Sequence, residues 1–372
     1  MTPIEFRRHL HAHPELSFRE HASAAFITER LQEEEIACRP IADTGVLAIV
    51  EGRSPHNRAV VLRADIDALP ISEATALPYA SQNEGIMHAC GHDMHAAILF
   101  GTLQRLHRQP DFDGTVIAIF QPAEECNPGG AAKVLAERPF EGYDVVAVIG
   151  EHVDSGLEVG EIGLCAGRFM ASNDELRLWV RGCGGHAANR AKITDTVTAA
   201  AHIVTMLNAV NDEQTLLSIG RIVADGATNV VPDEVYLEGT LRSFDEGARR
   251  TAWRIIEGVA ASIDSKFGTT TAVDINHGYP CVINDPSLVD FARKAASDDF
   301  RTVELSPRMT SEDFGRYCSE YTSLFYRLGV GAAAGGSHTP TFNPDERAIE
   351  TGIDYMCRLT VKTANEYGTA KE

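Results

Sequence analysis

Short apolar runs alternate with helix-like segments over the first half of the chain. Four runs are predicted as buried strands: Val46–Val50, Ala59–Leu62, Thr115–Phe120 and Tyr143–Ile149. Helical spacing of apolar residues covers three segments: 3–37, His95–Arg108 and Ala131–Glu137. Strands that alternate with helices are typical of a mostly parallel sheet with helices on both faces. The fold class predicted for this part is therefore α/β.

The pattern changes near residue 171. The predicted elements are then strand, helix, two strands, helix and strand, at Asp174–Arg181, Asp195–Val210, Leu216–Ala224, Glu234–Leu241, 245–267 and 270–276. This β-α-β-β-α-β order is that of a small ferredoxin-like α+β domain. After Pro280 the mixed pattern returns, with Pro286–Ala296 and Ser311–Tyr317 as predicted helices. We expect a catalytic domain formed by residues 1–170 and 282–372, with an inserted domain at 171–281.

Composition and charge argue against two classes of partner. The 372 residues include 33 Lys and Arg against 53 Asp and Glu, which gives a formal net charge of -20. Such a surface repels phosphate backbones and anionic lipids, so we expect neither nucleic-acid nor membrane binding. Plain solubility is the simplest explanation of the acidic surface.

The cysteines and the N-terminus bear on the compartment. Eight cysteines are scattered along the chain without a C-x-x-C pair. No run approaches the roughly 20 apolar residues that cross a bilayer. The first residues, M-T-P-I-E-F-R-R-H-L-H, lack the apolar core of a signal peptide. Because such cysteine usage is typical of a reducing compartment, we expect a cytoplasmic protein.

The densest chemical signal is Met87–His95, which reads M-H-A-C-G-H-D-M-H. It gathers Cys90, His92, Asp93 and two further histidines just before a predicted helix. Thiolate, imidazole and carboxylate are the groups that bind transition metals. By itself such a cluster is as often a packed helix start, so the metal interpretation needs support from elsewhere.

Support comes from the ends of two predicted strands. The run T-V-I-A-I-F-Q-P-A-E-E ends with Glu124 and Glu125, and Y-D-V-V-A-V-I-G-E-H ends with Glu151 and His152. In open α/β sheets, ligands bind beyond the carboxyl ends of the strands. Of two adjacent carboxylates, one can bind metal while the other moves protons. A solvated loop is the alternative for an isolated Glu pair, and it is disfavoured beside the other ligand residues.

Three further segments carry candidate residues. Asp65 and Asp67 end a third strand, where they could orient a ligand histidine or cap the next turn, and the turn is favoured for Asp65. His338 follows a glycine-rich loop, G-V-G-A-A-A-G-G-S-H-T-P-T-F. Prolines exclude the helix that a dinucleotide site would need there, so a ligand histidine is expected. His186 lies in R-G-C-G-G-H-A-A-N of the inserted domain, either as an ordinary surface histidine or as an oxyanion stabiliser.

Nucleophilic catalysis is the competing chemistry. The chain has no G-x-S-x-G elbow, so a serine nucleophile has little support. Cys90 as a covalent nucleophile stays open because nearby histidines could lower its pKa. That role would leave the two glutamates and His152 unused, so it ranks second.

Taken together, these stretches resemble the aminoacylase-like metallopeptidase family, in the branch of hippurate hydrolases and indole-acetyl-amino acid hydrolases. The matching stretches follow the family's order over nearly the whole chain: R-R-H-L-H-A-H-P-E-L-S, L-R-A-D-I-D-A-L-P-I, M-H-A-C-G-H-D-M-H, F-Q-P-A-E-E, G-C-G-G-H-A-A, N-V-V-P-D-E-V-Y-L-E-G-T-L-R, S-E-D-F and S-H-T-P-T-F. The resemblance implies a zinc-peptidase-like catalytic domain with an inserted lid and dimerisation domain.

The resemblance also implies roles for single residues. Two divalent metal ions would be held by Cys90, His92, Glu125, His152 and His338. Glu124 would be the general base, and His186 would help to polarise the substrate carbonyl. Asn229 and Arg242 would meet the substrate carboxylate or the partner subunit. Zinc or manganese is expected, with nickel and cobalt as alternatives.

The predicted function is metal-dependent hydrolysis of N-acyl amino acids, N-acetyl, benzoyl or similar, to a carboxylate and a free amino acid, by a homodimer. Departures from the family pattern at Cys183, Asn189–Arg190 and Glu151 spare the proposed ligands and bear on substrate identity. Two alternatives stay open: a dipeptidase or aminopeptidase on the same scaffold, and a non-catalytic metal-binding protein of this fold. The presence of Glu124 argues against the second, because a binding protein needs no base.

Overall fold

The computed structural model describes residues 1–367, which form two compact units. Unit 1 consists of Met1–Gly167, Ile283–Ser306 and the chain from Asp313 onward, and unit 2 of Arg168–Val282 and Pro307–Glu312. The chain leaves unit 1 within β7 (Gly167–Met170) and returns within β14 (Val282–Asn284).

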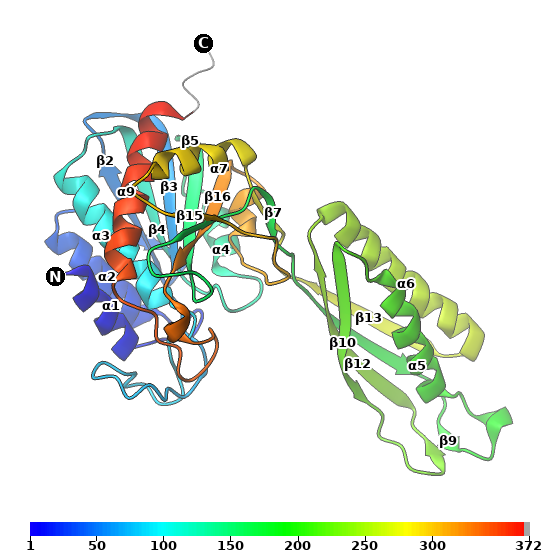
Figure 1. The fold of residues 1–372 in the computed structure, drawn as a ribbon. Helices are drawn as coiled ribbons and strands as arrows, with labels where there is room; N and C mark the ends of the chain where they lie inside the picture. The colour runs from blue at the N-terminus through cyan, green and yellow to red at the C-terminus, as the bar shows by residue number, and fades with distance from the viewer. Residues whose placement is uncertain (368–372) are drawn as a thin grey trace. The chain divides into compact units, whose positions relative to one another are not determined.

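Unit 1 is built on an eight-stranded sheet in the order β1-β2-β4-β3-β5-β16-β6-β15 (Figure 1). The strands are β1 (Ala37–Ile41), β2 (Gly45–Glu51), β3 (Ser54–Asp65), β4 (Asp113–Gln121), β5 (Asp144–Asp154), β6 (Ile162–Leu164), β15 (Thr302–Glu304) and β16 (Ser323–Gly329). The central strands β4, β3, β5 and β16 are parallel, whereas β1 and β2 pair antiparallel and β6 is antiparallel to β16. Residues 59–65 of β3 are all buried, so both faces of the sheet are covered there.

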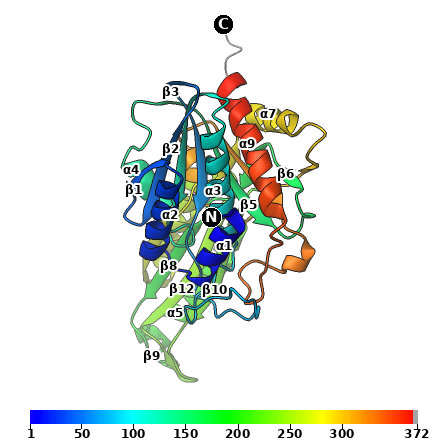
Figure 2. The same ribbon diagram turned by 90° about the vertical axis from the view of Figure 1, so that its left-hand side faces the viewer.

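Seven α-helices of unit 1 pack on this sheet: α1 (Pro3–Ala12), α2 (His21–Glu33), α3 (His92–Arg108), α4 (Gly130–Ala136), α7 (Pro286–Ala296), α8 (Gly315–Cys318) and α9 (Ala348–Glu366). Helix α1 begins at a capping box, in which the Thr2 hydroxyl accepts from the Glu5 N–H and the Glu5 carboxylate accepts from the Thr2 N–H. Helix α3 is buried on nearly all sides and packs against both α1 and α9 (Figure 2). Its central run A-A-I-L-F-G has no polar side chain, as expected of a helix at the centre of a domain.

Unit 2 has the ferredoxin-like topology predicted from the sequence. Its sheet runs β10 (Thr215–Val223), β12 (Glu234–Ser243), β8 (Asp174–Arg181) and β13 (Thr270–His277), all antiparallel. Helices α5 (Thr196–Leu207) and α6 (Glu246–Phe267) cover the face whose residues alternate as buried along β8 and β12 (Figure 1). A separate two-stranded sheet pairs β9 (Gly185–His186) with β11 (Val230–Val231).

Several sequence expectations need correction. The helical pattern over 3–37 is two helices separated by a loop that contains Pro14, and it ends before β1. The helix predicted at Ser311–Tyr317 is shorter in the structure, where α8 covers only Gly315–Cys318. Strand β16 and helix α9 are absent from the sequence prediction.

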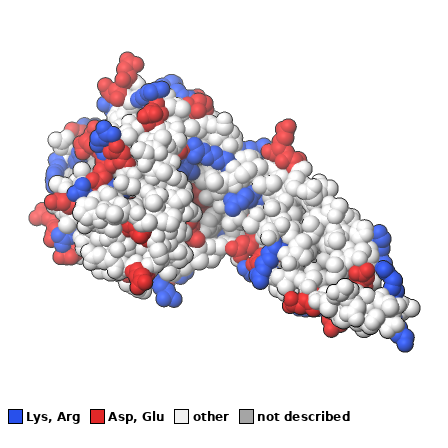
Figure 3. Space-filling model, turned by 60° about the horizontal axis from the view of Figure 1, so that its bottom comes forward, with Lys and Arg blue, Asp and Glu red and all other residues white. Residues whose placement is uncertain are grey.

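The surface carries charges of both signs. On the face drawn in Figure 3, acidic and basic side chains are interspersed between large uncharged areas. Among residues 1–367, no helix combines the length and apolar character that a membrane span requires.

Unit 2 is predicted to depend on one buried carboxylate, Asp174. Its oxygens accept from Arg249 Nε and Nη2 at 2.9 and 2.5 Å, from Trp253 Nε1 at 2.7 Å and from the Gly278 N–H at 3.1 Å. Asp174→Ala leaves the Arg249 guanidinium buried with only Glu246 as a carboxylate partner, and should cost about 3 kcal/mol of unfolding free energy. Urea unfolding followed by tryptophan fluorescence measures this loss, because both tryptophans lie in unit 2.

The matched control is Glu175→Ala at the next position of β8. Glu175 makes an exposed ion pair with Arg177 at 3.0 Å, and such pairs contribute at most about 1 kcal/mol. Equal losses for the two variants would contradict the role given to Asp174.

Candidate metal centre

The five side chains predicted to bind metal, and the predicted general base Glu124, come from the carboxyl ends of the central strands and from the start of α3. They are Cys90 and His92 around Gly91, Glu124 and Glu125 after β4, His152 near the end of β5, and His338 after β16. Because β4, β3, β5 and β16 are parallel, their carboxyl ends meet at one edge of the sheet. All six residues belong to unit 1.

The ligand atoms of these residues form three overlapping groups. In each group, all atoms lie within 4.8 Å of one another. The groups are Cys90 with His92 and His152, Cys90 with Glu125 and His338, and His92 with Glu124 and Glu125. Groups that share members match the two-metal sites of hydrolytic enzymes, where the ions lie about 3.5–4 Å apart.

Unsatisfied buried atoms show that these residues fit cations. His92 Nε2 is buried without a hydrogen-bond partner among the described residues, 3.9 Å from Glu125 Oε1, and that oxygen in turn lies 3.2 Å from His338 Nε2. A buried polar atom left unsatisfied costs about 1–3 kcal/mol, which a bound cation would recover. Cys90 Sγ lies 3.3 Å from His152 Nε2, so a thiol and an imidazole also face the same point. This combination of sulfur, nitrogen and oxygen donors suits divalent transition metals.

One carboxylate, that of Asp67, orients two of the proposed ligands. His92 Nδ1 lies 2.9 Å from the Asp67 backbone oxygen and 3.1 Å from Asp67 Oδ1, so its Nδ1–H points away from the site and Nε2 points into it. Asp67 Oδ2 accepts from the Glu125 N–H at 2.9 Å and from Ser17 Oγ at 2.7 Å. The sequence argument missed Ser17, although it ends the R-R-H-L-H-A-H-P-E-L-S stretch.

Both ring nitrogens of His95 have hydrogen-bond partners within the protein, so neither is available to a metal ion. Its Nδ1 lies 2.6 Å from Asp65 Oδ1, and its Nε2 accepts from the Val153 N–H at 3.0 Å. Asp65 also accepts from Arg63 Nη1 at 2.7 Å. Asp65 therefore anchors His95 and Arg63, and the turn-capping role favoured from the sequence is not its function here.

The electrostatics of the centre differ from ligand to ligand. Burial lowers the pKa of His152 well below its usual value, so its ring is neutral and donates from Nδ1 to the Val153 oxygen at 2.7 Å. Burial raises the pKa of the Cys90 thiol to about 12. Burial alone would lower the pKa of His92, but the charge of Asp65 and the hydrogen bond to Asp67 raise it well above its usual value.

The three remaining predicted residues belong to unit 2. His186 pairs with Val230 in the two-stranded β9–β11 sheet, and the oxygen of the neighbouring Asn229 accepts from the Ala187 N–H at 2.9 Å. Both residues are exposed. Arg242 lies on β12, where its Nη1 donates to the Met309 oxygen at 3.0 Å and to Ser311 Oγ at 3.2 Å. The structure thus places His186 beside Asn229 and binds Arg242 to another segment of unit 2, while their substrate roles stay predictions.

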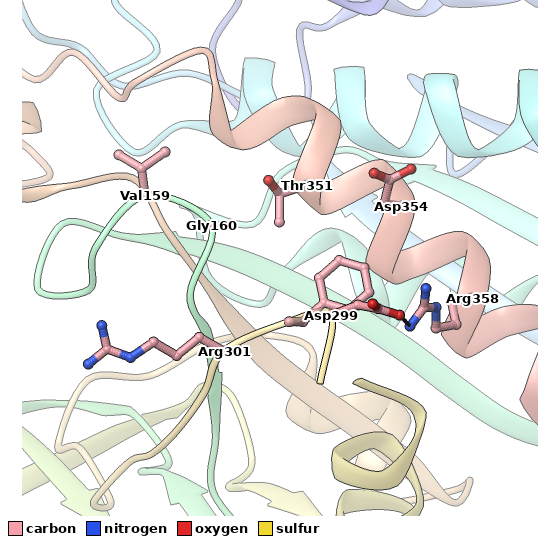
Figure 4. A pocket seen from close by; sticks show the side chains of 8 residues that line it. Val159, Gly160, Asp299, Arg301, Thr351, Asp354 and Arg358 are labelled. Carbon is pink, nitrogen blue, oxygen red and sulfur yellow. Dashed lines mark hydrogen bonds and ion pairs between the residues drawn. The ribbon is translucent and has the colours of Figure 1, made fainter. Parts of the chain in front are cut away.

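A hollow of about 490 Å³ on unit 1 has a different character (Figure 4). It is lined by Val159, Gly160, Asp299, Phe300, Arg301, Thr351, Asp354 and Arg358. Its charged groups are already paired, Asp299 with Arg358 at 2.6 Å and Arg301 with Glu161 at 2.8 Å. It contains none of the proposed metal ligands, and its charges are satisfied without a ligand.

Comparisons with known proteins agree with this geometry. The model of Peptidase family M20/M25/M40 matches residues 61–362. An N-acetyl-L-cysteine deacetylase of Bacillus subtilis is 38% identical over 93% of this chain and 84% of its own length, and an N-acyl-L-amino acid amidohydrolase of Geobacillus stearothermophilus is 40% identical over 76% and 77%. The crystal structure of a Bacillus subtilis dinuclear metal binding peptidase of the M20 family superposes with a TM-score of 0.87 at 35% identity, over 97% of both chains.

Metal binding is predicted to release protons. The raised pKa values of Cys90 and His92 mean that both side chains carry a proton at neutral pH in the metal-free protein. A cation that takes their lone pairs displaces both protons, so affinity should rise by up to about 100-fold per pH unit while the pH stays below both pKa values. Calorimetric titration of divalent metal in buffers of different ionisation enthalpy counts the protons.

Cys90→Ser provides the control for this count. A serine hydroxyl keeps its proton when it meets a metal ion, so about one proton fewer should be released. Metal binding that is independent of pH in the natural protein would show that neither group is a ligand.

Proposed function

The chain belongs to Peptidase family M20/M25/M40 and is an amidohydrolase, and we propose that it uses divalent metal ions to cleave the amide bond of N-acyl amino acids. The products are a carboxylate and a free amino acid. The observation that carries this proposal is the placement of Glu124, whose carboxylate lies within 4.8 Å of ligand atoms of His92 and Glu125. A carboxylate at that position can accept a proton during hydrolysis, whereas a protein that only stores metal needs no such group.

Five side chains would hold two ions: Cys90, His92, Glu125, His152 and His338. Such ions, when bound, polarise the amide carbonyl and bring the pKa of a water towards neutrality. Glu124 accepts the proton of the attacking water at its carboxylate. The same carboxyl then delivers that proton to the leaving nitrogen as the C–N bond breaks, so that one water is added across the amide.

His186 is proposed to donate a hydrogen bond to the carbonyl oxygen. Its Nδ1 accepts from the Ala188 N–H at 3.2 Å, so the proton of the neutral ring lies on Nε2. An exposed Nε2–H is the kind of donor that stabilises an oxyanion. Asn229 and Arg242 are proposed to meet the substrate carboxylate or the partner subunit, as parts of an inserted lid at residues 171–281.

Zinc or manganese is the proposed metal, with nickel and cobalt as the alternatives. The thiol of Cys90 and the three imidazoles favour zinc, while Glu125 also suits manganese. We further propose a cytoplasmic setting, supported by eight cysteines without paired spacing; cell fractionation tests it.

The substrate class is tested by release of free amine from N-acetyl amino acids, N-benzoyl amino acids and dipeptides. Chelator-treated protein is re-supplied with one divalent metal at a time. We expect metal-dependent cleavage of acyl amino acids. Cleavage of dipeptides alone would replace this proposal by a peptidase function.

Glu124→Gln is predicted to lower turnover about 10²- to 10⁴-fold while the metal content stays unchanged, because the amide keeps its shape and cannot accept the proton. Metal analysis and amine release on the same sample measure both quantities. Glu125→Gln is the matched variant at the next residue and should lose metal as well as activity. Loss of metal in Glu124→Gln would show that Glu124 is a ligand.

A homodimer is proposed through unit 2. Strand β10 is an edge of its sheet and carries the exposed apolar side chains Leu216 and Ile222, which are 41% and 56% exposed. Helix α5 adds Val197 and Met206. An apolar edge strand is a surface that natural proteins cover by pairing.

Ile222→Glu is therefore predicted to weaken dimerisation about tenfold or more, because it places a charge within an apolar contact. Sedimentation velocity over a dilution series gives the dissociation constant. Ile255→Glu on α6, at a site that is 42% exposed, should leave it unchanged. A natural protein that sediments as a monomer at all concentrations would exclude the dimer.

A further inference from the structure

The chain between Asp67 and Cys90 forms a compact loop that is closed at its base. Leu69 and Met87 exchange both backbone hydrogen bonds at 3.0 Å, so residues 70–86 form an Ω-loop. Asp67 lies just before this base and Cys90 just after it. Long ordered loops in compact domains usually serve a function. Here both ends of the loop lead into the metal centre.

A buried ion pair fastens the Ω-loop to α1. Glu73 Oε1 lies 3.2 Å from His11 Nε2, and their side chains are 5% and 0% exposed. His11 Nδ1 lies 2.9 Å from Asp93 Oδ2, and Asp93 also accepts from Arg7 Nε at 2.9 Å. Glu73 Oε2 accepts from the Ser81 N–H at 2.6 Å, which draws the two sides of the loop together.

Both partners of this pair are charged at neutral pH. Burial alone would lower the pKa of His11, but the charge of Asp93 raises it to about 9. Burial alone would raise the pKa of Glu73, but hydrogen bonds from His11, Thr75 and Ser81 lower it to about 2. The loop is therefore held by an ion pair whose side chains are largely shielded from water, which strengthens their attraction.

The Ω-loop in turn contacts the segment of His338. The Ala74 N–H donates to the Pro340 oxygen at 2.8 Å, and the His338 N–H donates to the Ala89 oxygen at 2.8 Å. His338 has a φ of 61°, a left-handed conformation that is unfavourable for a residue with a side chain. Such strain persists only where neighbouring contacts hold the backbone. The bonds to Ala74 and Ala89 on either side provide that hold.

We propose that Glu73 and His11 are positioning residues of the metal centre, which hold the Ω-loop so that it keeps His338 in place as a ligand. The inference rests on the metal-binding role proposed for His338. The positioning role should concern only one of the two ions. His338 belongs to the group with Cys90 and Glu125 and not to the group with His92 and His152. Weakening the pair should therefore affect one of the two ions.

The test is Glu73→Gln, which keeps the shape of the side chain and removes its charge. We expect its weaker metal equivalent to bind about 10- to 100-fold less tightly, the usual effect of losing a group that supports a ligand. The stronger equivalent should keep its affinity. Competition with a chromogenic chelator measures both constants without substrate. Raising the metal concentration by the same factor should restore kcat, since every ligand and Glu124 remain.

Two further variants make the result decisive. Glu84→Gln makes the same chemical change at an exposed position of the same loop and should alter neither constant. Ala74→Pro removes the N–H that reaches Pro340 and keeps both side chains of the ion pair, so it should weaken the same single equivalent. Ala74→Pro also provides the test of the inference if Glu73→Gln does not fold.

The outcomes separate this inference from the proposed function. Unchanged metal affinity in Glu73→Gln and Ala74→Pro, or equal loss of both equivalents, would overturn the positioning role. Selective loss of one equivalent supports it even if the panel of acyl amino acids shows no turnover, in which case only the proposed function fails.

Discussion

The parallel pairing of β4, β3, β5 and β16 is the constraint on which the metal centre depends. Parallel strands all end at the same edge of the sheet, so residues far apart in sequence arrive together there. His152 is opposite Arg327 in the pairing of β5 with β16. A slip of one residue would turn the His152 side chain to the other face of the sheet. The buried apolar runs of these strands prevent the slip, because it would change which side chains meet in the core.

A network of buried charged side chains next to the proposed ligands fixes the positions of the ligand side chains. Arg63 is fully buried and donates to Asp65 and to Asp313, both at 2.7 Å. Asp65 holds His95, and His95 Nε2 accepts from the Val153 N–H next to His152. Removing one partner of such a network typically costs about 3–5 kcal/mol, since another charge stays buried without compensation. The positions of the proposed ligands therefore depend on buried ion pairs, and loss of these pairs would destabilise unit 1.

The sequence could predict the elements and residues whose signal is local. Strand β4 and helix α7 follow clear apolar patterns, and the proposed ligands concentrate at strand ends. Strand β16 was not predicted because Arg327 interrupts its apolar run, although all seven of its residues are buried in the structure. His92 and His95 occupy similar sequence contexts. The structure distinguishes the proposed ligand His92 from the supporting residue His95, because the Val153 N–H occupies Nε2 of His95. The role of His186 depends on long-range placement of unit 2, which no local pattern encodes.

The same burial decides between two roles for Cys90. A catalytic cysteine needs a lowered pKa, which a nearby cation or a helix N-terminus supplies. Here burial raises the pKa of Cys90 to about 12, and His152, the imidazole 3.3 Å away, has a pKa lowered by its own burial. That imidazole is a poor acceptor for the thiol proton, so the pair cannot form a reactive thiolate at neutral pH. A divalent cation would stabilise the thiolate directly, so the buried position of Cys90 favours the ligand role proposed for it, with Glu124 as the proposed base.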